Sequence, residues 1–293
     1  MRFTGLADFI FHLHQFEFLQ NALITGILAS LACGVIGSYV VTRRITYIAG
    51  AIGHCVLGGM GAARYLEVVH QWNWLHPLHG AVVATLVSAF IISMATIRRS
   101  QREDTLVSAI WAIGMAIGIM FIFKTPGYGE DLMSYLFGNI LMVSGKDLWI
   151  IAGLDALIMI VVIVFYNQML SICFDEEFAR LRGIRIEYYY TVLICLTALT
   201  VVLLVTVVGI VMVIALLTLP AAIANFFLKK LWKVMILASF LTLFFTSSGL
   251  IISYSFDFPV GAATVLLTGA FYLFADSLAR TLRRISAKPK RIS

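Results

Sequence analysis

The sequence predicts an all-α fold, a polytopic transmembrane helical bundle of about eight or nine spans. Hydrophobic residues make up 61% of the 293 residues and charged residues only 12%, whereas soluble domains carry about 25% charged residues. The mean hydropathy is +0.98. The apolar runs are about 20 residues long, which is the length of a helix that crosses the hydrocarbon core, and they lack the alternating pattern of a membrane barrel.

The apolar runs divide the chain into nine candidate spans. An interfacial segment at 1–18 precedes the transmembrane domain at 19–280, and a basic cytosolic tail follows at 281–293. A further apolar stretch, 131–143, is too short to cross the membrane, so we expect it to be re-entrant or packed against the bundle. The spans lie at about 19–41, 48–66, 80–97, 105–123, 148–167, 188–207, 209–227, 234–253 and 260–280.

The positively charged residues predict the orientation, because cytoplasmic loops of membrane proteins carry an excess of Lys and Arg. With nine spans and the N-terminus outside, only Arg2, Arg64, Lys124 and Lys146 of the 21 Lys and Arg residues fall on the outer side. The polar run at 174–184 then lies in the cytosol. The net charge of +6 reflects this topology, and we expect no binding to nucleic acid.

The second span contains His54 in the middle of a run of small and apolar residues, IAGAIGHCVLGGMG. Glycines in such a run let neighbouring helices approach its backbone closely. An ionisable side chain at membrane depth is by default a functional hypothesis. Two interpretations are open: His54 is a ligand or gate residue on an ion path, or it is a neutral histidine bonded to a backbone carbonyl of the next helix.

Asp155 is the only acidic residue deep in a span. It either contributes to a metal site with His54 or makes a hydrogen bond between helices. Pro220, in the run LLTLPAAIAN, removes a backbone donor, so we expect a kink or a broken helix there. Gly209 and Pro259 are the other candidate kink or pathway residues.

Motifs for catalysis or nucleotide binding are absent from the sequence. The pair Gly145-Lys146 is followed by Asp147, and Ile140 stands where a phosphate-binding loop needs its first glycine. No metalloprotease or nucleophile-elbow motif occurs either. We therefore expect a protein without catalytic residues and without a permanently bound cofactor.

Six stretches, in register over about residues 19–280, resemble the permease subunit of the zinc/manganese/iron-type ATP-binding-cassette importers. The first runs from a small-residue helix through Arg43 and Arg44 to His54, GVIGSYVVTRRITYIAGAIGHCVLGGMG. The others are REDTLVSAIWAIGMAIG at 102–118, YLFGNILMV at 135–143, FDEEFARLRGI at 174–184, VGIVMVIALLTLPAAIA at 208–224 and GLIISYSFDFPVG at 249–261.

The resemblance implies a transport subunit of the bacterial cytoplasmic (inner) membrane that moves a divalent transition metal (manganese, zinc or iron) inward. Its implied partners are an ATPase subunit at the cytosolic face, an extracytoplasmic solute-binding protein, and a second permease chain, identical or related. The segment 174–184 would be the coupling helix, and the segment with Pro220 would transmit the ATPase movement or line the path. The coupling residues would be Phe174, Asp175, Glu176, Glu177, Ala179 and Gly183.

One position departs from the family pattern. Family members that carry zinc or manganese usually have an aspartate one turn before the histidine, where this chain has Gly50. Since His54 alone cannot neutralise a divalent charge, either Asp155 completes the site or the metal passes without a tight stop. Two alternatives stay open: an importer permease for a metal chelate of the siderophore or cobalamin type, and an ATP-independent secondary metal transporter, which should show internal repeats.

Overall fold

The computed structural model describes residues 15–72, 74–97, 103–126, 138, 143–256 and 258–286. Every regular element in these ranges is a helix, which confirms the predicted fold class. The helices are α2 (Glu17–Thr42), α3 (Thr46–Val69), α4 (Pro77–Ile97), α5 (Glu103–Lys124), α7 (Gly145–Val164), α8 (Tyr166–Phe174), α9 (Glu176–Leu181), α10 (Ile186–Val208), α11 (Ile210–Phe227), α12 (Leu231–Phe256) and α13 (Val260–Ser286).

Eight of these helices are long and apolar enough to cross a membrane. The helix α3 has 24 residues but is not among the eight, because its glycines, His54, Arg64 and Glu67 lower its hydropathy. The prediction of eight or nine spans is therefore confirmed. The fifth predicted span, 148–167, runs past the end of α7 at Val164 into a separate helix, α8.

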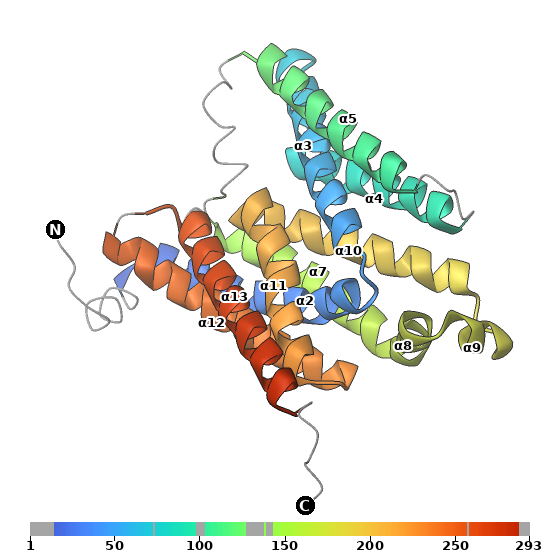
Figure 1. Cartoon of the computed structure of the whole chain (residues 1–293). Helices are drawn as coiled ribbons and strands as arrows, with labels where there is room; N and C mark the ends of the chain where they lie inside the picture. Colours follow the sequence, from blue (N-terminus) through green and yellow to red (C-terminus); the bar gives the residue numbers. More distant parts are fainter. Residues whose placement is uncertain are drawn as a thin grey trace, which may run out of the picture.

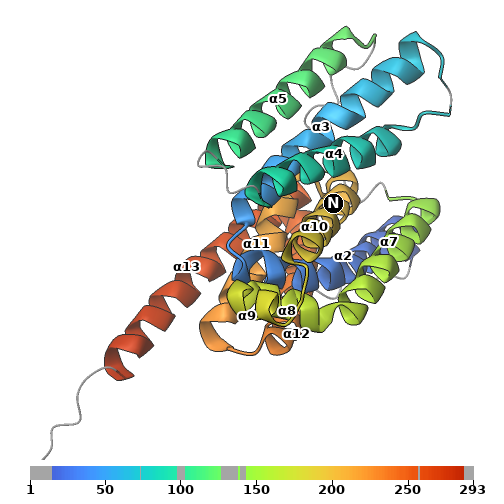
Figure 2. The same ribbon diagram turned by 90° about the vertical axis from the view of Figure 1, so that its right-hand side faces the viewer.

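The bundle has two parts, which both views separate (Figures 1 and 2). The helices α3, α4 and α5 lie side by side, with α3 in contact with both of the others. In the larger part α2 packs against α7, α11 and α12, while α13 covers α11 and α12. The helix α10 contacts α3 and α4 as well as α2 and α11, so it joins the two parts.

Glycines on two faces of α3 set its distance from its neighbours. A Cβ atom built at Gly58 would lie 2.7 Å from the carbonyl oxygen of Gly114 on α5. On the other face, a Cβ at Gly59 would collide with the backbone of Gly80 on α4. Close packing of α3 through its backbone, expected from its small residues, is thus present on both sides.

The helix α11 continues through Pro220 without a break, so the alternative of a broken helix is wrong, and a kink at Pro220 stays a prediction. The chain breaks instead at Gly209, where φ is 77° and α10 gives way to α11. This φ lies in the left-handed region that glycine adopts most readily. Pro259 lies directly before α13, and its carbonyl accepts a hydrogen bond from Ala263 N at 3.1 Å.

Several predicted segments fall largely outside the described residues: 1–14 of the interfacial segment, 131–137 and 139–142 of the short apolar stretch, and 287–293 of the tail. Residues 281–286 of the expected tail continue α13. Val143, which ends the short stretch, accepts a hydrogen bond from Asn21 Nδ2 at 3.1 Å. The stretch therefore ends next to the start of α2.

Candidate functional site

The imidazole of His54 lies against α5. It stacks on the indole of Trp111, with ring centroids 4.6 Å apart and an interplanar angle of 16°. Its Nδ1 atom is buried and has no hydrogen-bond partner in the part of the chain that the structure describes. The alternative in which His54 bonds to a carbonyl of a neighbouring helix is therefore not seen at Nδ1. In the neutral tautomer that carries its proton on Nε2, the Nδ1 lone pair could bind a cation.

One turn before His54, α3 carries a glycine, Gly50, and so has no side chain at that position. A Cβ atom built at Gly50 would meet only the Cζ3 atom of Trp111, at 4.0 Å. One turn earlier, the Tyr47 ring lies 6.0 Å from the indole, and its hydroxyl group contacts Ser108. The indole of Trp111 therefore lies between the imidazole of His54 and the ring of Tyr47 in a row of aromatic contacts, beside a turn of α3 that carries no side chain at Gly50.

Asp155 lies elsewhere in the bundle. Its side chain on α7 is 4% exposed, its Oδ1 atom has no partner within the described ranges, and it is in electrostatic contact with Cys33 on α2. Within those ranges, no three His, Cys, Asp or Glu side chains gather closely enough to hold a metal ion. The structure thus shows two separate ionisable groups rather than a shared site with three protein donors.

The segment 174–184 forms a short capped helix. Asp175 precedes α9, and its Oδ1 atom accepts a hydrogen bond from Phe178 N at 2.9 Å. Gly183 follows the end of α9, with a φ of 74° and an amide that donates to Arg180 O at 3.0 Å. An aspartate cap at the start and a left-handed glycine at the end are the ordinary signals that fix a helix's limits.

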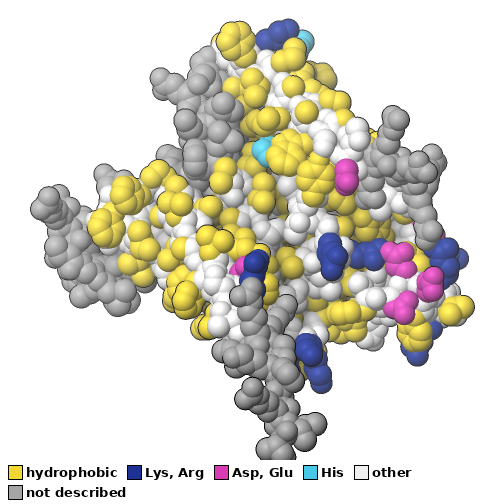
Figure 3. Space-filling model, in the orientation of Figure 1, with side chains coloured by type: hydrophobic (Ala, Val, Ile, Leu, Met, Phe, Trp, Pro, Cys, Tyr) yellow, Lys and Arg dark blue, Asp and Glu magenta, His cyan; other side chains and the backbone are white. Residues whose placement is uncertain are grey.

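Arg43 holds this segment against the end of α2. Its guanidinium group pairs with Glu176 and donates from Nη1 to Ile172 O at 2.9 Å. Ala179 is completely buried, whereas Leu181 is 88% exposed and Phe178 is also exposed. Figure 3 shows several acidic and basic side chains gathered at this end, with hydrophobic side chains among them. The segment is therefore fixed on its inner side and open on its outer side.

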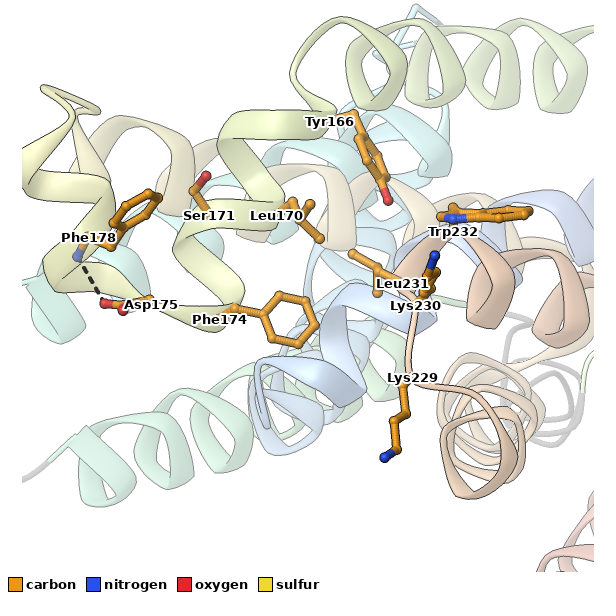
Figure 4. Close-up of a pocket in the computed structure, with 10 residues that line it drawn as sticks. All are labelled: Tyr166, Leu170, Ser171, Phe174, Asp175, Phe178, Lys229, Lys230, Leu231 and Trp232. Carbon is orange, nitrogen blue, oxygen red and sulfur yellow. Dashed lines mark hydrogen bonds between the residues drawn. The ribbon is translucent and has the colours of Figure 1, made fainter.

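A groove with a volume of about 440 Å³ lies between this segment and the start of α12. Figure 4 shows the Tyr166 hydroxyl and the Lys230 ammonium group pointing into one space, while Lys229 points away. Phe174 lines the side opposite Trp232. Sequence reasoning missed this groove, although a tryptophan next to lysines at the end of a span was a visible signal.

The sequence matches the profile of the ABC 3 transport family over residues 15–279. The chain belongs to the ABC 3 transport family. It is therefore a multi-pass membrane permease and a transport subunit rather than an enzyme, which confirms the resemblance and the expected location in the bacterial inner membrane.

Three relatives of this ABC 3 chain span nearly its whole length. It is 37% identical to a probable metal transport system membrane protein of Chlamydia trachomatis, over 92% of each chain. It is 31% identical to the manganese import system permease protein ScaB of Streptococcus gordonii, over 97% of this chain and 100% of ScaB. The solved structure of PsaBC from Streptococcus pneumoniae in complex with Fab superposes with a TM-score of 0.82 at 32% identity, covering 92% of this chain and 95% of that chain.

Proposed function

We propose that this chain is the permease subunit of an ATP-binding-cassette importer that moves a divalent transition metal inward across the cytoplasmic membrane. The observation that carries the proposal is the full-length similarity to permeases named for manganese import. Manganese is therefore the first metal to test, with zinc and iron next. All three bind a neutral imidazole nitrogen readily.

His54 is the proposed contact for the cation in the membrane. It is supported by its buried Nδ1 without a partner and by its place on a glycine-rich helix. A single neutral imidazole without an adjacent carboxylate binds a divalent ion weakly, which suits a site that the ion must leave again. Asp155 remains a prediction as a second contact, at a separate place along the route.

The segment 174–184 is the proposed coupling element for a separate ATPase subunit. The exposed side chains of Phe178 and Leu181 are costly to leave in water and suit a partner groove. The pair of Arg43 and Glu176 transmits a push on α9 directly to α2. ATP binding in the partner would then shift the permease between outward and inward access.

Each chain carries one such segment, so two permease chains are needed to face both halves of an ATPase dimer. The second chain is identical or related. A solute-binding protein outside the membrane would deliver the metal, and membrane lipid surrounds the apolar faces of the spans. The ATPase subunit supplies the energy, and the permease itself makes and breaks no covalent bond.

The test is reconstitution of the permease, the ATPase subunit and the binding protein in liposomes. We expect the metal-loaded binding protein to stimulate ATP hydrolysis and to drive uptake of radioactive Mn²⁺. Stimulation by a metal chelate but not by the bare ion would favour the chelate importer. Metal uptake that continues without ATP or the ATPase subunit would favour a secondary transporter, and either result would contradict the proposal.

A further inference from the structure

The indole of Trp111 covers one face of the His54 imidazole. The two rings are nearly parallel, at an interplanar angle of 16°, and the buried Nδ1 atom is left without a partner. An imidazole binds a metal through a lone pair in the plane of its ring, so stacking on its face does not block the ligating atom. The stack therefore fixes the plane of the ring while Nδ1 stays available.

The indole also lies beside the turn that precedes His54. A Cβ at Gly50 would be 4.0 Å from the indole Cζ3 atom, which is an ordinary van der Waals contact. His54 and Trp111 each lie eight residues after the start of their helix, at Thr46 and Glu103. Both are therefore about 12 Å from the same end of the α3–α5 pair. Gly50 and the indole of Trp111 therefore present no side-chain oxygen to the imidazole.

The pairing of α3 with α5 is already set by glycine contacts. A Cβ at Gly58 would lie 2.7 Å from Gly114 O, and a Cβ at Gly61 would lie 2.8 Å from Gly118 O. These backbone contacts hold the two helices together one to two turns beyond His54. Trp111 is only half-buried, so part of its indole lies outside the packed interface.

We propose that Trp111 is a specificity-determining residue of the cation path. This inference rests on the proposed role of His54. A cation at Nδ1 lies in the plane of the imidazole, and the indole that covers one face of this ring offers only its π face in place of water on that side. Transition metals recover this cost by binding nitrogen. Mg²⁺ loses its bound water only reluctantly, and Ca²⁺ prefers six to eight oxygen ligands, so binding of both ions at this site is disfavoured.

The test compares three substitutions in the reconstituted importer. Trp111→Phe keeps an aromatic face, Trp111→Ala removes it, and Trp149→Ala is the control, since Trp149 is 82% exposed. We expect Mn²⁺ uptake within twofold of wild type for Trp111→Phe and Trp149→Ala. For Trp111→Ala we expect uptake at least tenfold lower, and inhibition by Mg²⁺ at a concentration at least tenfold lower than in wild type.

A second measurement covers the case in which Trp111→Ala fails to assemble. In a chain with Trp72, Trp74, Trp149 and Trp232 replaced by phenylalanine, Trp111 is the only tryptophan, so it alone gives tryptophan fluorescence. We expect Mn²⁺, which is paramagnetic, to quench its fluorescence in the assembled importer, and His54→Ala to abolish the quenching. Absence of quenching in the single-tryptophan chain would overturn the inference.

The two proposals fail separately. Normal uptake by His54→Ala would remove the proposed role of His54 and this inference with it. If His54→Ala abolishes uptake while Trp111→Ala matches Trp149→Ala in uptake and in inhibition by Mg²⁺, only the role of Trp111 is wrong.

Discussion

At the scale of single residues, the proposed function rests on one imidazole. We predict that His54→Ala lowers metal uptake by at least tenfold while the amount of assembled complex is unchanged. The reason is that, among the described residues, no group of three or more His, Cys, Asp or Glu side chains could hold the metal in its place. Uptake of Mn²⁺ into liposomes measures the effect.

The control for this substitution is His70→Ala, because His70 lies in the exposed turn after α3. It should leave uptake within twofold of wild type. If both substitutions behave alike, His54 is a packing residue and the cation crosses elsewhere.

The sequence alone predicts His54 because an ionisable residue inside an apolar run is a local signal. Its partner Trp111 could not be predicted in the same way, since stacking depends on how α3 and α5 are rotated about their axes. That rotation is set by glycine contacts between residues more than 50 positions apart, such as Gly58 and Gly114. For the same reason the depth of Asp155 was predictable, and its location against α2 rather than near His54 was not.

At the scale of elements, α3 packs between α4 and α5 through close backbone contacts at its glycines. We predict that Gly59→Ala destabilises the permease, because the new Cβ would collide with the backbone of Gly80 and lie 2.7 Å from the Ala84 Cβ atom. Overpacking of this kind costs about 1–3 kcal/mol. A lower melting temperature of the detergent-solubilised chain should follow.

Gly53→Ala is the matched control on the same helix. Its Cβ would lie 3.6 Å from the nearest atom, Val201 Cγ1, and alanine favours a helix over glycine. This variant should melt at or slightly above the temperature of the wild-type chain. Equal destabilisation by both variants would mean that the α3–α4 contact is looser than the structure indicates.

The short helix α9 is the element through which the ATPase is expected to act. We predict that Glu177→Lys lowers co-purification of the ATPase subunit by at least tenfold, because it reverses an exposed charge at the first turn of α9. Gly183→Pro should do the same, since proline cannot adopt a φ of 74°.

Glu17→Lys serves as the control, because Glu17 is exposed and begins α2, at the opposite end of that helix from Arg43, which pairs with α9. It should retain the ATPase subunit. Normal co-purification and uptake with Glu177→Lys and Gly183→Pro would show that the ATPase docks elsewhere.

Pro220 and Gly209 show how far the helix propensities of single residues predict where a helix ends. Proline removes one hydrogen bond and predicts a kink or a broken helix, and α11 continues through the buried Pro220 without a break. A break falls at Gly209, which lies between α10 and α11 and has a φ of 77°. Tertiary packing decides which of the two helix-breaking residues interrupts a helix, and a short stretch of sequence does not encode that packing.

At the scale of the whole molecule, hydropathy predicts the number of spans because each span must satisfy its own backbone in lipid. Hydropathy does not predict that the bundle divides into a three-helix part, α3–α5, and a larger part around α2. This division arises because only some helices carry small residues on the faces that meet. A Cβ at Gly37 on α2, for example, would collide with Leu217 O on α11.

The orientation in the membrane gives the last prediction. Arg43 and α9 share one end of the bundle, together with Lys229 and Lys230 in the groove beside α9. This end should be cytosolic, because basic residues are retained on that side. The turn with Trp72 and Trp74, after α3, should face outward as an aromatic interface anchor.

Single cysteines test this orientation, in a chain whose native Cys33, Cys55, Cys173 and Cys195 have been replaced. Trp74→Cys, at a position 71% exposed, should react with a membrane-impermeant maleimide in intact cells. Leu181→Cys on α9 should react only in inverted vesicles. Labelling of both from the same side would put the coupling segment and the tryptophan turn in one compartment. An ATPase at α9 could then no longer drive a cation that enters from the opposite face.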